Sequence, residues 1–123
     1  MKPDERRAAD RYEVTWSVDC ETPDTFLYAS ITNISALGIF VQTTDPLPIG
    51  TRMTLRFAPP GGEPFTLHGL VQWVNPFRPG GDNPNPGMGI QFVELSAADR
   101  ERLIEVIKTI AYVREGTPRE QPN

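Results

Sequence analysis

Residues 11–20, RYEVTWSVDC, alternate between two kinds of side chain, and this stretch decides the class of fold. One set is apolar: Tyr12, Val14, Trp16, Val18 and Cys20. The other set is polar or charged: Arg11, Glu13, Thr15, Ser17 and Asp19. Because successive side chains of a strand point to opposite faces, the pattern predicts a half-buried antiparallel strand.

Turn-forming residues divide the rest of the chain into five more segments that are typical of strands. These segments are residues 26–32, 38–44, 51–57, 65–75 and 87–95. Residues 78–87, RPGGDNPNPG, are too rich in Pro and Gly to join a sheet and predict one long irregular loop. The 13 Pro and 10 Gly of the whole chain also favour short strands joined by turns.

A helix is expected after the last strand, over about residues 96–114, with Ser96 as its N-terminal cap. Its apolar side chains recur near the helical period: Leu103, Ile104, Val106, Ile107, Ile110, Ala111 and Val113. Gly116 and Pro118 are expected to end it, which leaves residues 116–123 as a disordered tail. The predicted fold is all-β: six antiparallel strands in a small closed or nearly closed barrel, with one C-terminal helix.

Composition limits the kinds of partner and the cellular location. A chain of 123 residues is expected to form one domain, and its net charge of -4 argues against wrapping nucleic acid by bulk electrostatics. The single cysteine, Cys20, can form neither an internal disulfide nor a cysteine-based zinc site, and is expected to be a buried apolar residue. No apolar run is long enough to span a bilayer or to serve as a signal peptide. We therefore expect a cytoplasmic protein that does not insert into membranes.

Catalytic and metal-binding residues are scarce. The one histidine, His68, lies on the polar side of its predicted strand and is expected to be an ordinary surface residue. The sequence contains no HExxH or GxSxG motif, and its glycine-rich stretches lack the Lys and Ser/Thr of a phosphate-binding loop. We expect neither an enzyme nor a bound metal or cofactor.

The segment before the first strand is basic in an otherwise acidic chain. Three guanidinium groups lie within six residues: Arg6, Arg7 and Arg11. Arginine can bind phosphate or the O6 and N7 atoms of guanine with two parallel hydrogen bonds, so this arm favours a small anionic ligand. The alternative is a solvated charge run, partly neutralised by the acids at positions 4, 5 and 10.

Residues 33–38, NISALG, connect two predicted strands with unusually polar chemistry. Asn33 can present a donor and an acceptor to a base edge, and Ser35 offers a hydroxyl to the backbone or to a phosphate. Gly38 permits a backbone conformation closed to other residues, or the close approach of a ligand. The alternative is a wide turn stabilised by Asn33, with a glycine bulge.

Together these two segments resemble the signature of PilZ domains. Residues 7–11, RAADR, match the pattern RxxxR, and residues 33–38 match [D/N]xSxxG, in the family's order and separation. The resemblance covers nearly the whole chain, including VQWVN in the fifth strand, GxGIxF in the sixth and the closing helix. PilZ domains are six-stranded barrels that bind the bacterial second messenger cyclic di-GMP, so it implies a receptor for this nucleotide.

The resemblance also implies a role for each residue of the signature. Arg7 and Arg11 would bind the phosphates and guanine edges, with Arg6 as a stacking or auxiliary residue. The roles implied for the connection are as follows: Asn33 faces a guanine, Ser35 supports it or a phosphate, and Gly38 allows close approach. Trp73 could stack on a guanine, but its alternation with Phe65, Leu67 and Val71 favours the core equally. Asn33 is neutral where an Asp would add charge to the contact with guanine.

The expected organisation is a flexible arm over residues 1–11, a barrel and helix over residues 12–115 and the tail. We expect the arm to become ordered on the ligand and so to signal to a separate partner protein in motility, pilus or biofilm control, as a monomer or weak dimer. One alternative is a PilZ-like scaffold in motility or polarity control that does not bind the nucleotide. A barrel for single-stranded nucleic acid is disfavoured by the acidic charge and the lack of surface aromatics interleaved with Lys.

Overall fold

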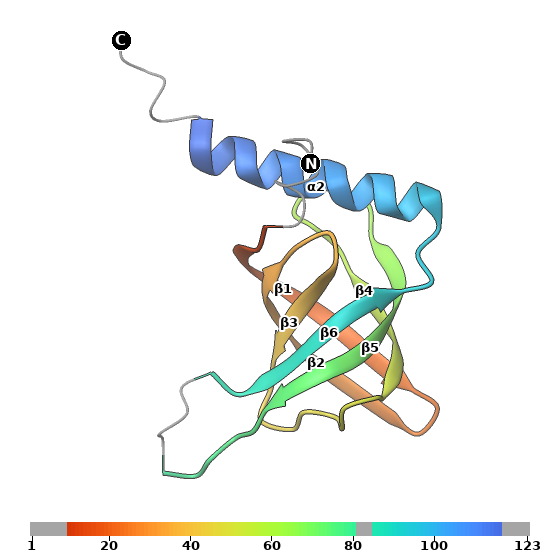
Figure 1. The fold of residues 1–123 in the computed structure, drawn as a ribbon, viewed down its shortest axis with the longest axis vertical. Helices are drawn as coiled ribbons and strands as arrows, with labels where there is room; N and C mark the ends of the chain where they lie inside the picture. The colour runs from red at the N-terminus through yellow and green to blue at the C-terminus, as the bar shows by residue number, and fades with distance from the viewer. Residues whose placement is uncertain (1–9, 81–84, 117–123) are drawn as a thin grey trace.

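The computed structural model describes residues 10–80 and 85–116, which form a six-stranded barrel and one helix (Figure 1). The strands are β1 (Tyr12–Thr22), β2 (Thr25–Ile34), β3 (Gly38–Gln42), β4 (Arg52–Phe57), β5 (Phe65–Asn75) and β6 (Gly87–Val93). The helix is α2 (Ala97–Gly116). All six neighbouring pairs of strands are antiparallel, and the order β1-β2-β3-β6-β5-β4 closes on itself. The predicted all-β barrel with a C-terminal helix is confirmed.

The inside of the barrel is filled by the apolar side chains of alternating strand positions. The predicted inward residues of β4 and β6 are all buried: Met53, Leu55, Phe57, Met88, Ile90 and Phe92. Cys20 is also fully buried, and burial raises the pKa of its thiol to about 12, with a smaller contribution from the charge of Asp19. This cysteine is therefore a core residue rather than a nucleophile.

Three irregularities in pairing interrupt the strict alternation of the long strands. The register shifts between Glu13 and Trp16 in β1, between Ile31 and Asn33 in β2, and between Val71 and Trp73 in β5. A bulge adds local twist and bends the strand that carries it, which helps a small sheet to close into a barrel. It also changes which face the following side chains occupy.

Helix α2 lies across one end of the barrel (Figure 1). The Ser96 hydroxyl accepts a hydrogen bond of 3.0 Å from the Asp99 amide, which confirms Ser96 as the N-terminal cap. Leu103, Ile107 and Ala111 follow one another at i, i+4 and i+8 and are fully buried.

The ends of α2 differ slightly from the expectation. The sequence places its end at about residue 114, whereas the structure continues it to Gly116. Residues 117–123 lie outside the described residues, as do residues 1–9 of the predicted arm. Within the described part of the chain, no helix combines the length and hydrophobicity needed to cross a membrane.

Candidate functional site

The connection between β2 and β3 is a compact turn built around Ser35. Its amide donates to the Gly38 carbonyl at 2.9 Å, and its hydroxyl oxygen accepts from the Leu37 amide at 3.0 Å. The Leu37 carbonyl in turn accepts from the Phe92 amide of β6 at 2.9 Å. Ser35 is buried, so its hydroxyl stabilises a fixed turn.

Arg11 docks on this turn from the start of β1. One guanidinium nitrogen, Nη1, lies 3.4 Å from the Ser35 hydroxyl oxygen and 3.3 Å from the Gly38 carbonyl oxygen. Partial burial lowers the pKa of Arg11 below its ordinary value, but an arginine remains charged at neutral pH. The structure thus brings the last residue of the RxxxR pattern into contact with the serine and the glycine of NxSxxG.

Gly38 is required by strand packing. Its φ is outside the left-handed region, so the expectation of a backbone conformation closed to other residues is wrong. A Cβ atom at this position would lie 2.2 Å from the Ile90 carbonyl oxygen, inside the backbone of β6. The glycine lets β3 approach β6 closely, and this explanation needs no ligand.

Trp73 lies on the outer surface of the barrel, with 48% of its surface exposed, so the core interpretation of this residue is wrong. The bulge in β5 explains the difference. Val71 pairs with Ile90, and Trp73 pairs with the adjacent residue of β6, Gly89, so β5 contains one extra residue at this point. The extra residue moves Trp73 to the opposite face from Val71. The indole stacks on Phe40, with ring centroids 5.3 Å apart, and covers this buried side chain. Trp73 therefore presents an exposed indole whose inner face is packed against Phe40.

The turn, Arg11 and Trp73 line one open pocket of about 340 Å³ on the outside of β3, β6 and β5. The exposed amides of Gln72 and Gln91 also line the pocket and are joined to each other, with the Gln72 Nε2 donating to the Gln91 Oε1 at 2.7 Å. A guanidinium, a pair of amides and an exposed indole are suited to an anionic ligand that carries a flat ring.

Three further site residues were predicted from the sequence, and only Asn33 among them is described by the structure. Arg6 and Arg7 lie outside the described residues. Asn33 lines a separate pocket with Glu13 and Arg114, and is absent from the lining of the pocket beside Arg11. The structure thus brings together four predicted residues in one pocket: Arg11, Ser35, Gly38 and Trp73. It places Asn33 in the separate pocket with Glu13 and Arg114.

Gly89 and Gln91 belong to the pocket but were not singled out by the sequence. A Cβ atom on residue 89 would lie 2.2 Å from the Trp73 indole nitrogen, so only glycine leaves room for the indole. The GMG tripeptide at residues 87–89 was a usable signal, since glycine inside a strand often marks the close approach of another group. Gln91 faces Gly38 across β3 and β6, a relation that depends on strand order.

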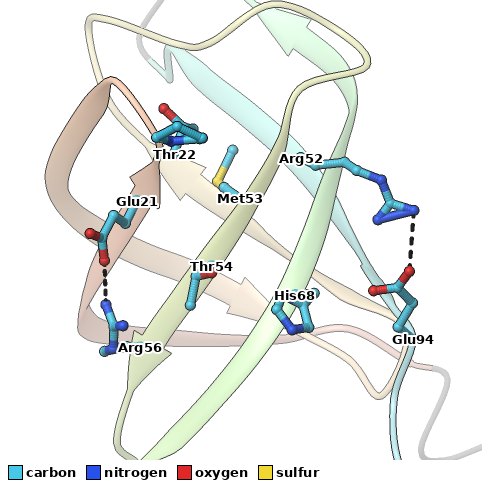
Figure 2. Close-up of a pocket in the computed structure, with 9 residues that line it drawn as sticks. Glu21, Thr22, Arg52, Met53, Thr54, Arg56, His68 and Glu94 are labelled. Atoms are coloured by element: carbon cyan, nitrogen blue, oxygen red, sulfur yellow. Dashed lines mark hydrogen bonds and ion pairs between the residues drawn. The ribbon is translucent and has the colours of Figure 1, made fainter.

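A further pocket, on the outer face of β4 and its neighbours, contains His68 (Figure 2). Arg56 pairs with Glu21 at 2.7 Å on one side, and Arg52 pairs with Glu94 at 3.5 Å on the other. His68 is exposed, as expected for a surface strand histidine. Among residues 10–80 and 85–116, no cluster of His, Cys, Asp or Glu could hold a metal ion.

The fold and site define a small closed antiparallel barrel with an open polar and aromatic pocket on its outer surface. A family model described as "PilZ domain" matches residues 5–109, and the chain belongs to this family. PilZ domains are binding domains. A comparison with curated proteins found no match to the chain.

Solved structures with the same fold include the following three. The Bacillus subtilis inhibitor of motility, MotI/DgrA, has a TM-score of 0.69 at 20% identity, over 87% of this chain and 51% of that chain. Escherichia coli YcgR in complex with c-di-GMP has a TM-score of 0.71 at 14% identity, over 85% and 46%. The YcgR PilZ domain with c-di-GMP has a TM-score of 0.65 at 16% identity, over 85% and 93%. The present chain spans about half the length of the MotI and YcgR chains.

Proposed function

We propose that this chain is a receptor for cyclic di-GMP and has no enzymatic role. The observation that carries the proposal is the placement of Arg11, held by Ser35 and Gly38 at the edge of the Trp73 pocket. Membership of the PilZ family and the two YcgR structures with c-di-GMP support it. The ligand would be a signalling molecule and not a cofactor.

The chemistry of the ligand suits this pocket. Cyclic di-GMP carries two phosphates and two guanines, so it needs both cations and flat apolar surfaces. Arg11 would bind a phosphate or a guanine edge, and Trp73 would stack on a base. Arg7 would act with Arg11, and Arg6 would be an auxiliary residue. Ser35 and Gly38 would act through the turn that positions Arg11.

We further propose that the predicted arm, residues 1–11, becomes ordered on the ligand over its part before the docked Arg11, and so changes the surface offered to a partner protein. Residues 12–115 would be the folded body, and residues 116–123 the tail. The similarity to MotI, an inhibitor of motility, favours motility control over pilus or biofilm control. A cytoplasmic monomer or weak dimer that binds neither DNA nor RNA accords with this role and with the net charge of -4.

Calorimetric titration of the wild-type chain with cyclic di-GMP tests the proposed function. We expect saturable heat with cyclic di-GMP and at least about tenfold weaker binding of cyclic di-AMP, because adenine lacks the guanine O6 and N2 groups. Amide signals of residues 5–10, before the docked Arg11, should become less mobile at saturation. An absence of binding heat at ligand excess would instead favour the PilZ-like scaffold that does not bind the nucleotide.

Trp73→Ala should weaken cyclic di-GMP binding by about tenfold, since stacking of a base on an aromatic side chain is worth about 1–3 kcal/mol. Trp73→Phe should restore most of the affinity because it keeps a ring over Phe40. Calorimetry gives the affinities. Thermal unfolding without ligand measures how much stability the variant loses because Phe40 becomes exposed, so that this loss can be separated from the loss of binding. Wild-type affinity in Trp73→Ala would contradict a stacking role.

A further inference from the structure

One end of β2 has a free edge. β2 pairs with β3 only from Ser30 onward, so residues 25–29 (the β2 edge) pair with β1 on one side and with no described strand on the other. After β3 the chain turns away from β2, since the Thr43 amide donates to the Pro86 carbonyl at 3.1 Å. Among residues 10–80 and 85–116, the β2 edge makes no backbone hydrogen bond outside the β1–β2 ladder. Its outward N–H and C=O groups are therefore available to another strand.

The side chains of the β2 edge do not protect it. The edge lies at the end of the barrel away from α2 (Figure 1), and Phe26 and Tyr28 on its outer face are 61% and 68% exposed. Soluble proteins usually protect free edges with charged side chains, Pro or a bulge. The sequence of the β2 edge, TFLYA, contains no charge and no Pro, and the register shift of β2 lies beyond it, between Ile31 and Asn33. This chemistry is typical of a contact surface.

A second copy of the chain complements the β2 edge in one antiparallel register. Residues directly opposite one another in an antiparallel pair share a face of the sheet. When Leu27 lies opposite Leu27 of the second copy, all of residues 25–29 pair, and each Phe26 lies opposite a Tyr28. A shift of two residues in either direction leaves fewer pairs and places only one aromatic residue of each copy opposite another. The sequence of the edge therefore favours the register centred on Leu27.

We propose that the chain forms a two-fold symmetric dimer through the β2 edge, in which the β1–β2 hairpins of two copies join into one sheet. Backbone hydrogen bonds and the two Phe26–Tyr28 pairs stabilise it, and the uncharged edge places no like charges opposite one another. The contact is small, so the dimer is weak. Because each chain has a net charge of -4, association should tighten as added salt screens the repulsion.

The dimer leaves the Arg11 pocket open. That pocket lies at the turn that follows the opposite end of β2, on the outside of β3, β6 and β5. Each dimer would carry two such pockets, one in each copy. The inference does not depend on the proposed function, because the β2 edge shares no residue with the pocket.

Sedimentation velocity of the full chain at increasing concentration tests the dimer. We expect a reversible change from monomer to dimer in the wild-type chain. Phe26→Lys/Tyr28→Lys should weaken association by at least about tenfold, because it removes both aromatic pairs and places lysines opposite one another. Within one chain each new lysine faces an acid of β1, since Phe26 pairs with Glu21 and Tyr28 with Asp19. The variant should therefore unfold at a temperature close to that of wild type.

Tyr112→Lys/Val113→Lys is the matched control. It makes the same change in net charge at exposed positions of α2 and should associate like wild type. A wild-type chain that stays monomeric at the highest soluble concentration would overturn the dimer and would favour a strand of a different protein on the β2 edge. Equal association by wild type and Phe26→Lys/Tyr28→Lys would place the interface elsewhere and overturn the proposal as well.

Disulfide formation tests the register. A mixture of Phe26→Cys and Tyr28→Cys chains should crosslink in oxidised glutathione, because opposite Cα atoms lie about 4.5–5.5 Å apart, within the reach of a disulfide. Phe26→Cys alone should crosslink far more slowly, since its two cysteines would be diagonal neighbours about 7–8 Å apart. The native Cys20 is fully buried and should not compete. Equal crosslinking of Phe26→Cys alone and of the mixture would contradict the register centred on Leu27.

Discussion

Arg11→Ala is expected to weaken cyclic di-GMP binding by about 100-fold or more, with little change in the stability of the barrel. Hydrogen bonds from a charged donor are worth about 1.5–3 kcal/mol each, and a guanidinium fork can form two with one phosphate or guanine. Arg11 is also already held at the pocket by Ser35 and Gly38, so little further ordering is needed when the ligand binds. Calorimetric titration of both proteins measures the difference.

Two further variants make the Arg11 result specific. Arg11→Lys keeps the positive charge without the planar fork, and should recover only a small part of the affinity. Arg100→Ala makes the same change in net charge at a helical position outside the pocket and should bind like wild type. An Arg11→Ala affinity within about threefold of wild type, a difference of less than about 1 kcal/mol, would place the ligand elsewhere on the molecule.

Gly38→Ala is expected to lower the free energy of unfolding by about 3 kcal/mol in the absence of any ligand. The added methyl group would lie 2.2 Å from the Ile90 carbonyl oxygen, and backbone atoms of a closed barrel can move only if β3 separates from β6. The turn that holds Arg11 would move with β3. Urea unfolding followed by circular dichroism measures the loss.

Gly50→Ala is the matched control for this substitution. Gly50 has a positive φ of 93°, but a Cβ atom there would meet nothing within 4 Å. Gly50→Ala should therefore lower the free energy of unfolding only through the left-handed backbone conformation, by about 1–2 kcal/mol. If Gly38→Ala unfolds like wild type and loses only ligand affinity, this glycine serves the ligand, and the packing explanation is wrong.

Alternation predicted the strands and the core because it depends only on which face each side chain occupies. It failed for Trp73 because a single bulge after Val71 moves the indole from the predicted inner face to the outside. Bulges arise from pairing between strands, and the sequence of one strand does not reveal them. The same limit applies to Asn33, whose pocket lies beside the bulges of β1 and β2.

The site was predictable where its residues belong to the PilZ signature or, as Trp73 does, to another stretch that resembles the family. Arg11 and the NISALG connection met these conditions, and the structure places them in contact. Gly89 gave a local signal that could have been used. Gln91 gave none, because its position opposite Gly38 depends on which strands are neighbours.

The pairing of β1 with β4 that completes the ring also restricts how another protein can recognise this one. A sheet with a free edge can recruit a partner by adding a strand through backbone hydrogen bonds, and the same edge makes a protein prone to aggregate. The described strands close into a ring, although residues 25–29 of β2 extend beyond β3 and pair with β1 alone. An effector that recognises the fully paired part of the ring must therefore bind its outward side chains or α2, and single substitutions there should be able to separate recognition of different effectors.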